Sequence, residues 1–144
     1  MQVKELMTPG VVCVSPEEPA AVAARLLARH NVGCLPVCGE HGMLRGMVTD
    51  RDIVLRCVAA EADPAKTTVG AIMTSRVLAV APEADAREAA EIMAREQVRR
   101  LPVADHGKVV GMVSLGDMAE IDRYRMEAAA CLCEICGNIK KRKA

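Results

Sequence analysis

The sequence predicts an α+β fold with helices and sheets in two layers. Two copies of a β-α-β-β-α unit pack through their sheets with pseudo-twofold symmetry, and a C-terminal helix follows. Three observations predict this fold: the 144-residue chain repeats itself, each half alternates short apolar runs with helical patterns, and the last stretch has an apolar stripe at helical spacing. We expect the first repeat at 1–62, the second at 63–125, and a C-terminal helix with a basic tail at 126–144.

The duplication is a sequence match at an offset of 66 positions. The run VGCLPV (32–37) aligns with VRRLPV (98–103). One residue is lost in the next turn, so GMVTDRD (46–52) aligns with GMVSLGD (111–117) at an offset of 65. A register kept over roughly 45 positions with one short gap indicates internal duplication rather than chance similarity.

Each copy is expected to contain the same elements in the same order. An extended piece (11–14 and 77–80) ends before a proline, since the residue before proline is pushed out of helical space. A helix follows, and then a β-hairpin whose turn contains the glycine that a tight turn needs. A second helix begins at TDRD or SLGD, and AEADPAKTT (60–68) links the copies. The first helix of each copy should bury an apolar face, made of Val22, Ala23, Leu26 and Leu27 or of Ala89, Ala90, Ile92 and Met93.

Composition excludes several classes of protein. Lys and Arg total 19 and Asp and Glu total 19, so the chain has no net charge to attract a polyanion. There is no Trp or Phe and one Tyr, so the stacking platforms of single-strand binders are missing. The start has no apolar signal region, no run is long enough to span a membrane, and seven scattered cysteines suit a reducing compartment. We expect a cytoplasmic protein with no membrane or nucleic-acid partner.

The ordered set of Pro-terminated strand, helix, LPV strand, GMVT..D strand and helix, present twice, resembles a tandem pair of cystathionine-β-synthase-type (CBS) domains, the Bateman module. The resemblance covers Val3 to about Glu120 and extends to short stand-alone bacterial proteins that contain little else. It implies a ligand sensor rather than an enzyme, with clefts between the two repeats and assembly as flat homodimers.

The TDRD and SLGD turns allow two interpretations. Thr49 and Ser114 are good N-caps, and Asp52 and Asp117 stand where the acid of a capping box belongs. A carboxylate at a helix start can equally accept hydrogen bonds from a ribose diol. The CBS resemblance implies the second role: these four residues would hold the ribose of AMP, ADP, ATP or S-adenosylmethionine. It also implies an adenine pocket of aliphatic groups and backbone, around Val12, Val32, Gly33, Leu78, Val98 and Arg99.

Phosphate groups require cations, and the candidates are Arg99, Arg100 and Arg51. Adjacent residues of a strand face opposite ways, so one of Arg99 and Arg100 should point inward, and the alternative for this pair is a solvated surface. The first copy has Gly33 and Cys34 where the second has the two arginines. The two sites should therefore differ chemically.

The C-terminal stretch CLCEICGNIKKRKA also has two interpretations. Cys133 and Cys136 have the spacing of half a zinc ribbon, with Cys131 as a possible third thiolate. A continuous helix is favoured instead, because an apolar stripe runs through it and no second CxxC completes the ribbon. The helix could pack back on the module or pair with a second subunit; we favour a homodimer. The stripe is Ile121, Ala128, Leu132, Ile135 and Ile139.

No Ser-His-Asp set, Gly-rich phosphate loop or paired catalytic carboxylates occur, so no enzyme activity is expected and no cofactor is required. The leading hypothesis is a non-catalytic sensor that binds an adenosine-containing ligand and passes the change to an unidentified effector protein. Two alternatives stay open. One is a metal- or redox-responsive module acting through the C-terminal cysteines, and the other is a dimeric scaffold with vestigial clefts.

Overall fold

The computed structural model describes the backbone of residues 1–143 and all of their side chains except those of Asp122 and 138–143. Ile139 and the basic run 140–143 of the predicted tail therefore lie outside the described side chains. The chain divides into two compact units. Unit 1 comprises Met1–Val11, Ala79–Asp105 and Val110–Ala144, and unit 2 comprises Val12–Leu78 and His106–Val109.

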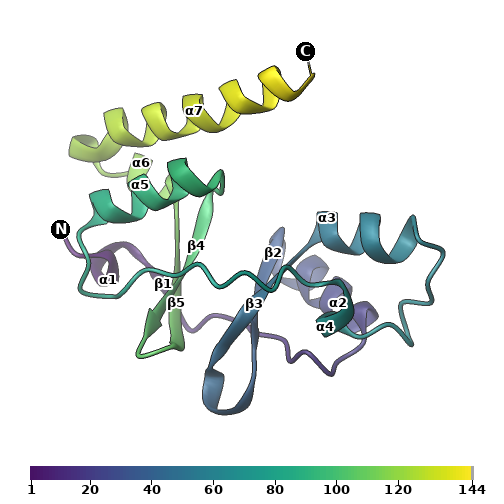
Figure 1. The fold of residues 1–144 in the computed structure, drawn as a ribbon. Coiled ribbons are helices and arrows are strands. Elements are labelled where there is room, and N and C mark those ends of the chain that lie inside the picture. The colour runs from purple at the N-terminus through teal and green to yellow at the C-terminus, as the bar shows by residue number, and fades with distance from the viewer. Residues whose placement is uncertain (144) are drawn as a thin grey trace. The chain divides into compact units, whose positions relative to one another are not determined.

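Unit 2 contains the helix and hairpin of the first repeat. In chain order its elements are α2 (Ala20–His30), β2 (Cys34–Cys38), the 3-10 turn η1 (Glu40–Gly42), β3 (Leu44–Thr49), α3 (Asp50–Ile53), the π-helical turn η2 (Val54–Val58) and α4 (Val69–Ile72) (Figure 1). Strands β2 and β3 pair antiparallel, with Cys34 opposite Thr49. The turn between them uses left-handed backbone at His41 and Gly42, as a tight hairpin requires. The predicted helix and hairpin are confirmed.

Unit 1 contains the corresponding elements of the second repeat and the C-terminal helix. They are α1 (Val3–Leu6), β1 (Thr8–Pro9), α5 (Ala86–Glu96), β4 (Arg100–Asp105), β5 (Lys108–Ser114), α6 (Leu115–Ala119), the 3-10 turn η3 (Asp122–Tyr124) and α7 (Arg125–Lys143). The sheet order is β1-β5-β4, with Thr8 opposite Met112. Residues 108 and 109, at the start of β5, group with unit 2.

In each unit, the last strand of the hairpin pairs with a short segment from the start of the other repeat. Thr74 exchanges two backbone hydrogen bonds with Met47 of β3, at 2.8 and 3.0 Å. This close approach explains the glycine of the GMV motif, since a Cβ on Gly46 would lie 2.4 Å from the carbonyl oxygen of Thr74. Gly111 is in the same position against Thr8, with a Cβ-to-oxygen distance of 2.9 Å. The segment near the start of each repeat thus pairs with the hairpin of the other repeat.

The burial of side chains on α2 and α5 shows which residues of the predicted apolar faces are covered. On α2, Ala23 and Leu27 are buried as predicted, whereas Val22 and Leu26 are half-buried. On α5, Ala89, Ala90 and Met93 are buried, and Ile92 is half-buried. The buried core of unit 2 is Val14, Ala20, Ala23, Leu27, Leu35, Val37, Val48, Cys57, Val69 and Ile72.

The extended pieces before the first helices differ from the prediction. Each is a single parallel bridge and not a strand of four residues: Val14 pairs with Val37, and Val80 with Val103. The physical reason is the neighbouring proline, which lacks an N–H and stops the pairing from extending.

Helix α7 packs back on unit 1, against α5 and α6 (Figure 1). Its buried side chains are Ala128, Cys131 and Ile135, and the thiol of Cys131 donates to the carbonyl oxygen of Ala90 over 3.6 Å. The prediction that Leu132 belongs to the buried stripe is wrong, since 42% of Leu132 is exposed. Leu132 lies at the edge of the helical face that residues 128, 131 and 135 share, about 100° round the helix from residue 131.

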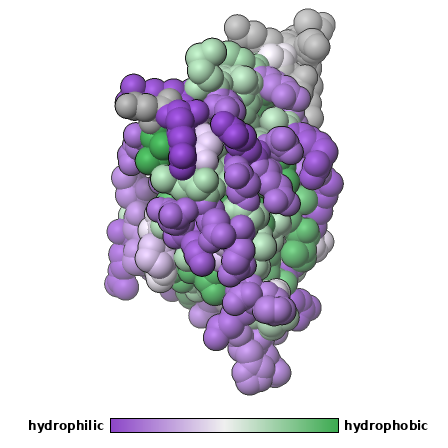
Figure 2. Space-filling view, turned by 90° about the vertical axis from the view of Figure 1, so that its left-hand side faces the viewer, coloured by the Kyte–Doolittle hydropathy of each residue, from purple (hydrophilic) through white to green (hydrophobic). Residues whose placement is uncertain are grey.

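The surface is mixed in character. Figure 2 shows hydrophilic side chains over much of the face it presents, with hydrophobic ones between them. Among the residues that the structure describes, no helix is both long enough and apolar enough to cross a membrane.

Candidate functional site

The first predicted ribose site lies at the start of α3. The hydroxyl of Thr49 accepts a hydrogen bond from the backbone N–H of Asp52 over 3.0 Å, and Oδ2 of Asp52 accepts one from the N–H of Thr49 over 3.0 Å. These reciprocal bonds form a capping box, which satisfies two amides that a helix start leaves unpaired. The helix-start interpretation therefore explains both side chains without any ligand.

The second predicted ribose site repeats this arrangement at the start of α6. The hydroxyl of Ser114 accepts from the N–H of Asp117 over 3.1 Å, and Oδ2 of Asp117 accepts from the N–H of Ser114 over 2.9 Å. The two capping boxes thus match bond for bond, although the residues inside the turn have changed from Asp-Arg to Leu-Gly.

Backbone bonds bring each helix start next to the segment predicted to hold adenine. The N–H of Asp50 donates to the carbonyl oxygen of Gly33 over 3.0 Å, and the N–H of Leu115 donates to that of Arg99 over 3.1 Å. Val12 and Val32 both pack against the core of unit 2. The first predicted set of ribose and adenine residues therefore lies within one unit. In the second set Val98 and Arg99 belong to unit 1 with Ser114 and Asp117, while Leu78 belongs to unit 2.

The two aspartates differ in what else they contact. Oδ1 of Asp52 accepts a hydrogen bond from the hydroxyl of Thr74 over 3.4 Å and lies 3.8 Å from Nη1 of Arg56, and only 7% of Asp52 is exposed. Asp117 is half-buried, and its Oδ1 has no hydrogen-bond partner among the described residues. One carboxylate is therefore fully engaged, and the other keeps an acceptor oxygen.

Arg56 and Thr74 were missed by the sequence analysis. Nη1 of Arg56 donates to the carbonyl oxygens of Ile72 and Met73, each over 3.1 Å, at the end of α4. The available signal was the helical i, i+4 spacing of Asp52 and Arg56. The second repeat has Ile121 at the corresponding position, so the duplication does not extend to this contact.

The predicted phosphate-binding arginines all have exposed side chains. Arg51 lies inside the α3 turn, and Arg99 and Arg100 lie at the entry to β4. Exposed guanidinium groups are accessible to a phosphate, but arginines that are merely solvated at the surface are exposed in the same way. A phosphate contact at any of the three stays a prediction.

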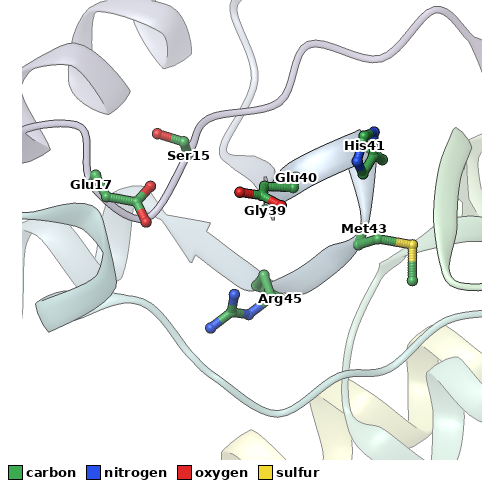
Figure 3. Close-up of a pocket in the computed structure, with 7 residues that line it drawn as sticks. All are labelled: Ser15, Glu17, Gly39, Glu40, His41, Met43 and Arg45. Carbon is green, nitrogen blue, oxygen red and sulfur yellow. The ribbon is translucent and has the colours of Figure 1, made fainter.

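A hollow of 750 Å³ lies elsewhere in unit 2 (Figure 3). Its wall comes from the segment before α2, the η1 turn and the start of β3, and none of the predicted ligand-binding residues lines it. The lining includes two acidic side chains, Glu17 and Glu40, and one basic side chain, Arg45. The remaining lining residues are Ser15, Gly39, His41 and Met43.

The C-terminal cysteines lie on a continuous helix. Cys133 is exposed and Cys136 is half-buried on α7, while Cys131 faces α5. Burial, with a smaller effect of the Glu134 charge, raises the pKa of the Cys131 thiol. No group of three or more His, Cys, Asp or Glu side chains suited to a metal occurs in the part of the chain that the structure describes.

Comparison with known proteins identifies the class. The CBS domain model matches residues 3–58 and 69–123, so the chain belongs to the CBS domain family and carries two such domains. The chain is 41% identical over 133 residues to the CBS domain-containing protein YhcV of Bacillus subtilis, a match that covers 92% of this chain and 94% of the relative. It is 38% identical over 116 residues to hypoxic response protein 1 of Mycobacterium tuberculosis, covering 81% of each.

Solved structures give the same result. A structure titled as hypoxic response protein I with two coordinated zinc ions superposes with a TM-score of 0.79 at 36% identity, covering 84% of this chain and 98% of that one. The CBS domain pair of protein MJ0100, in complex with 5-methylthioadenosine and S-adenosyl-L-methionine, superposes with a TM-score of 0.75 at 27% identity, covering 85% and 96%. The recognised fold and duplication are confirmed.

Proposed function

We propose that this protein is a non-catalytic regulatory module that binds an adenosine-containing ligand at the start of α6. AMP, ADP, ATP and S-adenosylmethionine are the candidate ligands, and a change on binding is passed to an effector protein. Two findings support this proposal: membership of the CBS family, and the complex of the MJ0100 domain pair with adenosyl compounds.

The observation that carries the proposal is the acceptor oxygen of Asp117. Its Oδ2 closes the capping box, and its Oδ1 has no partner among the described residues. A ribose hydroxyl is a donor that this oxygen can accept, and a hydrogen bond to a carboxylate contributes about 1.5–3 kcal/mol. Arg99, whose backbone carbonyl oxygen accepts a hydrogen bond from the N–H of Leu115 at the start of α6, is the candidate for a phosphate contact at this site.

The first site should bind the ligand more weakly than the second. Oδ1 of Asp52 already faces Thr74 and Arg56, and Asp52 is almost fully buried. A ligand would have to displace these contacts before it could bind the carboxylate. We therefore propose that Thr49 and Asp52 act chiefly in stability, and that Ser114 and Asp117 act in binding.

The test is calorimetric titration of AMP, ATP and S-adenosylmethionine into wild type and two matched variants, Asp117→Asn and Asp52→Asn. Asparagine keeps one oxygen for the capping bond and replaces the other with a donor. We expect Asp117→Asn to weaken binding roughly tenfold to a hundredfold, the range that 1.5–3 kcal/mol gives. Asp52→Asn should change affinity by less than about threefold, and its effect should appear in the melting temperature.

Equal loss in both variants would contradict the assignment to the α6 site, and binding untouched by either would remove the aspartates from the site. Absence of binding by wild type would favour the scaffold alternative, in which the protein is a homodimer with vestigial clefts. Zinc that co-purifies and is lost on Cys133→Ser would favour the metal alternative, for which the zinc-bound relative is the precedent.

A further inference from the structure

The hollow of unit 2 is a cavity that the proposed adenosine site does not use. It has a volume of 750 Å³ and is lined by residues of unit 2 alone. None of the residues predicted to hold ribose, adenine or phosphate lines it. Its volume falls within the range of about 300–1,000 Å³ that small-molecule sites occupy. The hollow is therefore large enough for a second ligand, and its lining determines which chemistry that ligand would need.

Backbone hydrogen bonds fix both walls of the hollow. On one wall, the N–H of Ser15 donates to Oε2 of Glu18 over 3.0 Å, and the N–H of Glu18 donates to the carbonyl oxygen of Ser15 over 3.2 Å. On the other wall, the N–H of Gly39 donates to the carbonyl oxygen of Met43 over 2.8 Å and closes the η1 turn. The parallel bridge described above joins the two walls. The hollow is thus preformed, so a ligand would bind without first ordering a loop.

Three charged side chains line the hollow from separate elements. Glu17 lies on the segment before α2, Glu40 lies in η1, and Arg45 lies on β3 (Figure 3). All three residues are exposed. Among the residues that the structure describes, none of these three side chains has an ion-pair or hydrogen-bond partner. Two carboxylates and one guanidinium group are therefore available to a ligand in the same hollow.

The position of the Arg45 side chain depends on a glycine. A Cβ on Gly39 would lie 3.3 Å from Nη1 of Arg45, 3.4 Å from its Cγ and 3.5 Å from its Cδ. The arginine side chain therefore lies along the Gly39 backbone from its aliphatic stem to its guanidinium group. A methyl group at position 39 would push the arginine aside, so the glycine allows the guanidinium group to lie in the wall of the hollow.

The second repeat lacks this set of side chains. Val110 stands at the position that corresponds to Arg45, and Ala81 at the position that corresponds to Ser15. An apolar residue therefore fits the same place in the second hairpin, and the repeated fold does not require the arginine. The charge set belongs to the first repeat alone, as expected of a ligand site rather than of a structural device that both repeats share.

We propose that the hollow binds a free basic amino acid of the lysine or ornithine type. The ligand's carboxylate pairs with the guanidinium group of Arg45, and its two ammonium groups pair with the carboxylates of Glu17 and Glu40. Met43, which is 43% exposed, offers an apolar surface to the ligand's methylene chain. A simple anion such as phosphate would meet two carboxylates of its own charge, and a polyamine would leave Arg45 unpaired.

The first experiment is an NMR titration of the ¹⁵N-labelled full-length protein with L-lysine. Amide signals of residues 15, 17 and 39–45 should shift. We expect a dissociation constant on the order of 1 mM, because each exposed ion pair contributes little free energy. Signals that stay in place up to about 20 mM lysine, or that shift mainly outside these residues, would overturn the proposal.

Three analogues of lysine test each charged group of the ligand. Cadaverine lacks the carboxylate, 6-aminohexanoate lacks the α-ammonium group, and norleucine lacks the side-chain ammonium group. Each should bind at least about threefold more weakly than lysine, since each loses one ion pair. Cadaverine binding as tightly as lysine would refute the pairing of a carboxylate with Arg45, and equal binding of either other analogue would refute the role given to the glutamates.

Variants of the protein test the same pairs from the other side. Arg45→Gln and Glu17→Gln should each weaken lysine binding roughly threefold to tenfold, whereas Arg45→Lys keeps the charge and should keep most of the affinity. Arg25→Gln is the matched control, because Arg25 is exposed on α2 of the same unit and does not line the hollow. All four variants should melt within a degree or two of wild type, as surface substitutions usually do. Unchanged lysine affinity in Arg45→Gln, or an equal loss in Arg25→Gln, would overturn the proposal.

The Gly39→Ala variant tests the placement of Arg45 without changing any charge. Its new methyl group should displace the guanidinium group and weaken lysine binding while the melting temperature stays the same. Wild-type affinity in this variant would contradict the placement of Arg45 argued above. The adenosine site is tested separately, because AMP, ATP and S-adenosylmethionine should bind Arg45→Gln as they bind wild type. Failure of one proposal is therefore distinguishable from failure of the other.

Discussion

Replacing Gly46 by alanine tests the segment exchange that completes unit 2. The added Cβ would lie 2.4 Å from the carbonyl oxygen of Thr74 and 3.2 Å from the Cα of Ser75. Both are backbone atoms, which cannot move away by a change of rotamer. The 74–75 segment must therefore shift, and the two hydrogen bonds between Thr74 and Met47 would lengthen or break.

The magnitude follows from these contacts. Two backbone hydrogen bonds contribute about 0.5–1.5 kcal/mol each, and overpacking by one methyl group costs about 1–3 kcal/mol. We expect Gly46→Ala to lower the free energy of unfolding by about 3 kcal/mol, which for a chain of this size corresponds to a fall in melting temperature of roughly 10 °C. Urea denaturation and differential scanning calorimetry measure the two quantities.

Gly39→Ala is the matched control. There the added Cβ would meet the side chain of Arg45 at 3.3 Å, and a flexible exposed side chain can move aside. Its stability should change by less than about 0.5 kcal/mol, as for most surface substitutions. If Gly46→Ala melts within a degree or two of wild type, the 74–75 segment does not cross β3 as tightly as described, and the explanation of the GMV glycine is refuted.

Three further predictions concern helix ends and a helix interior. Ser114→Ala removes the N-cap of α6 and should lower the free energy of unfolding by about 1 kcal/mol in urea; an unchanged midpoint would argue against the cap. The hydrogen bond from the Arg87 N–H holds the pKa of Asp85 below its usual value, against a smaller opposing effect of burial. A carboxyl group whose pKa is lower in the folded protein stabilises the fold at pH values above its unfolded pKa, and this stabilisation is lost as the pH falls. The difference in melting temperature between wild type and Asp85→Ala should therefore shrink below about pH 4. A difference that stays constant with pH would contradict this. Gly137→Ala, with no atom within 4 Å of the new Cβ in α7, should raise stability by about 0.5–1 kcal/mol, and a measured loss would show a contact there.

Local signals in the sequence were enough for the repeats, the two long helices and the hairpins. Prolines at 16 and 82 end the extended pieces, and glycines stand in the turns of the two hairpins. Capping by Thr49 and Ser114 is one of the two interpretations that the sequence allows, and both capping boxes are present in the structure. These features depend on residues within a few positions of one another, so they can be inferred without tertiary contacts.

Only the tertiary structure decided which segments complete which unit. Residues 1–11 group with the second repeat, and 69–78 group with the first. The reason is that a short segment pairs with whichever unpaired strand edge the folded chain places beside it. The unequal surroundings of Asp52 and Asp117 depend on the same kind of long-range contact, since Thr74 reaches Asp52 from 22 positions away. Side chains separated by 20 positions or more meet only when packing brings their backbones together. The periodicity and spacing of residues in the sequence do not predict which distant segments will pack together.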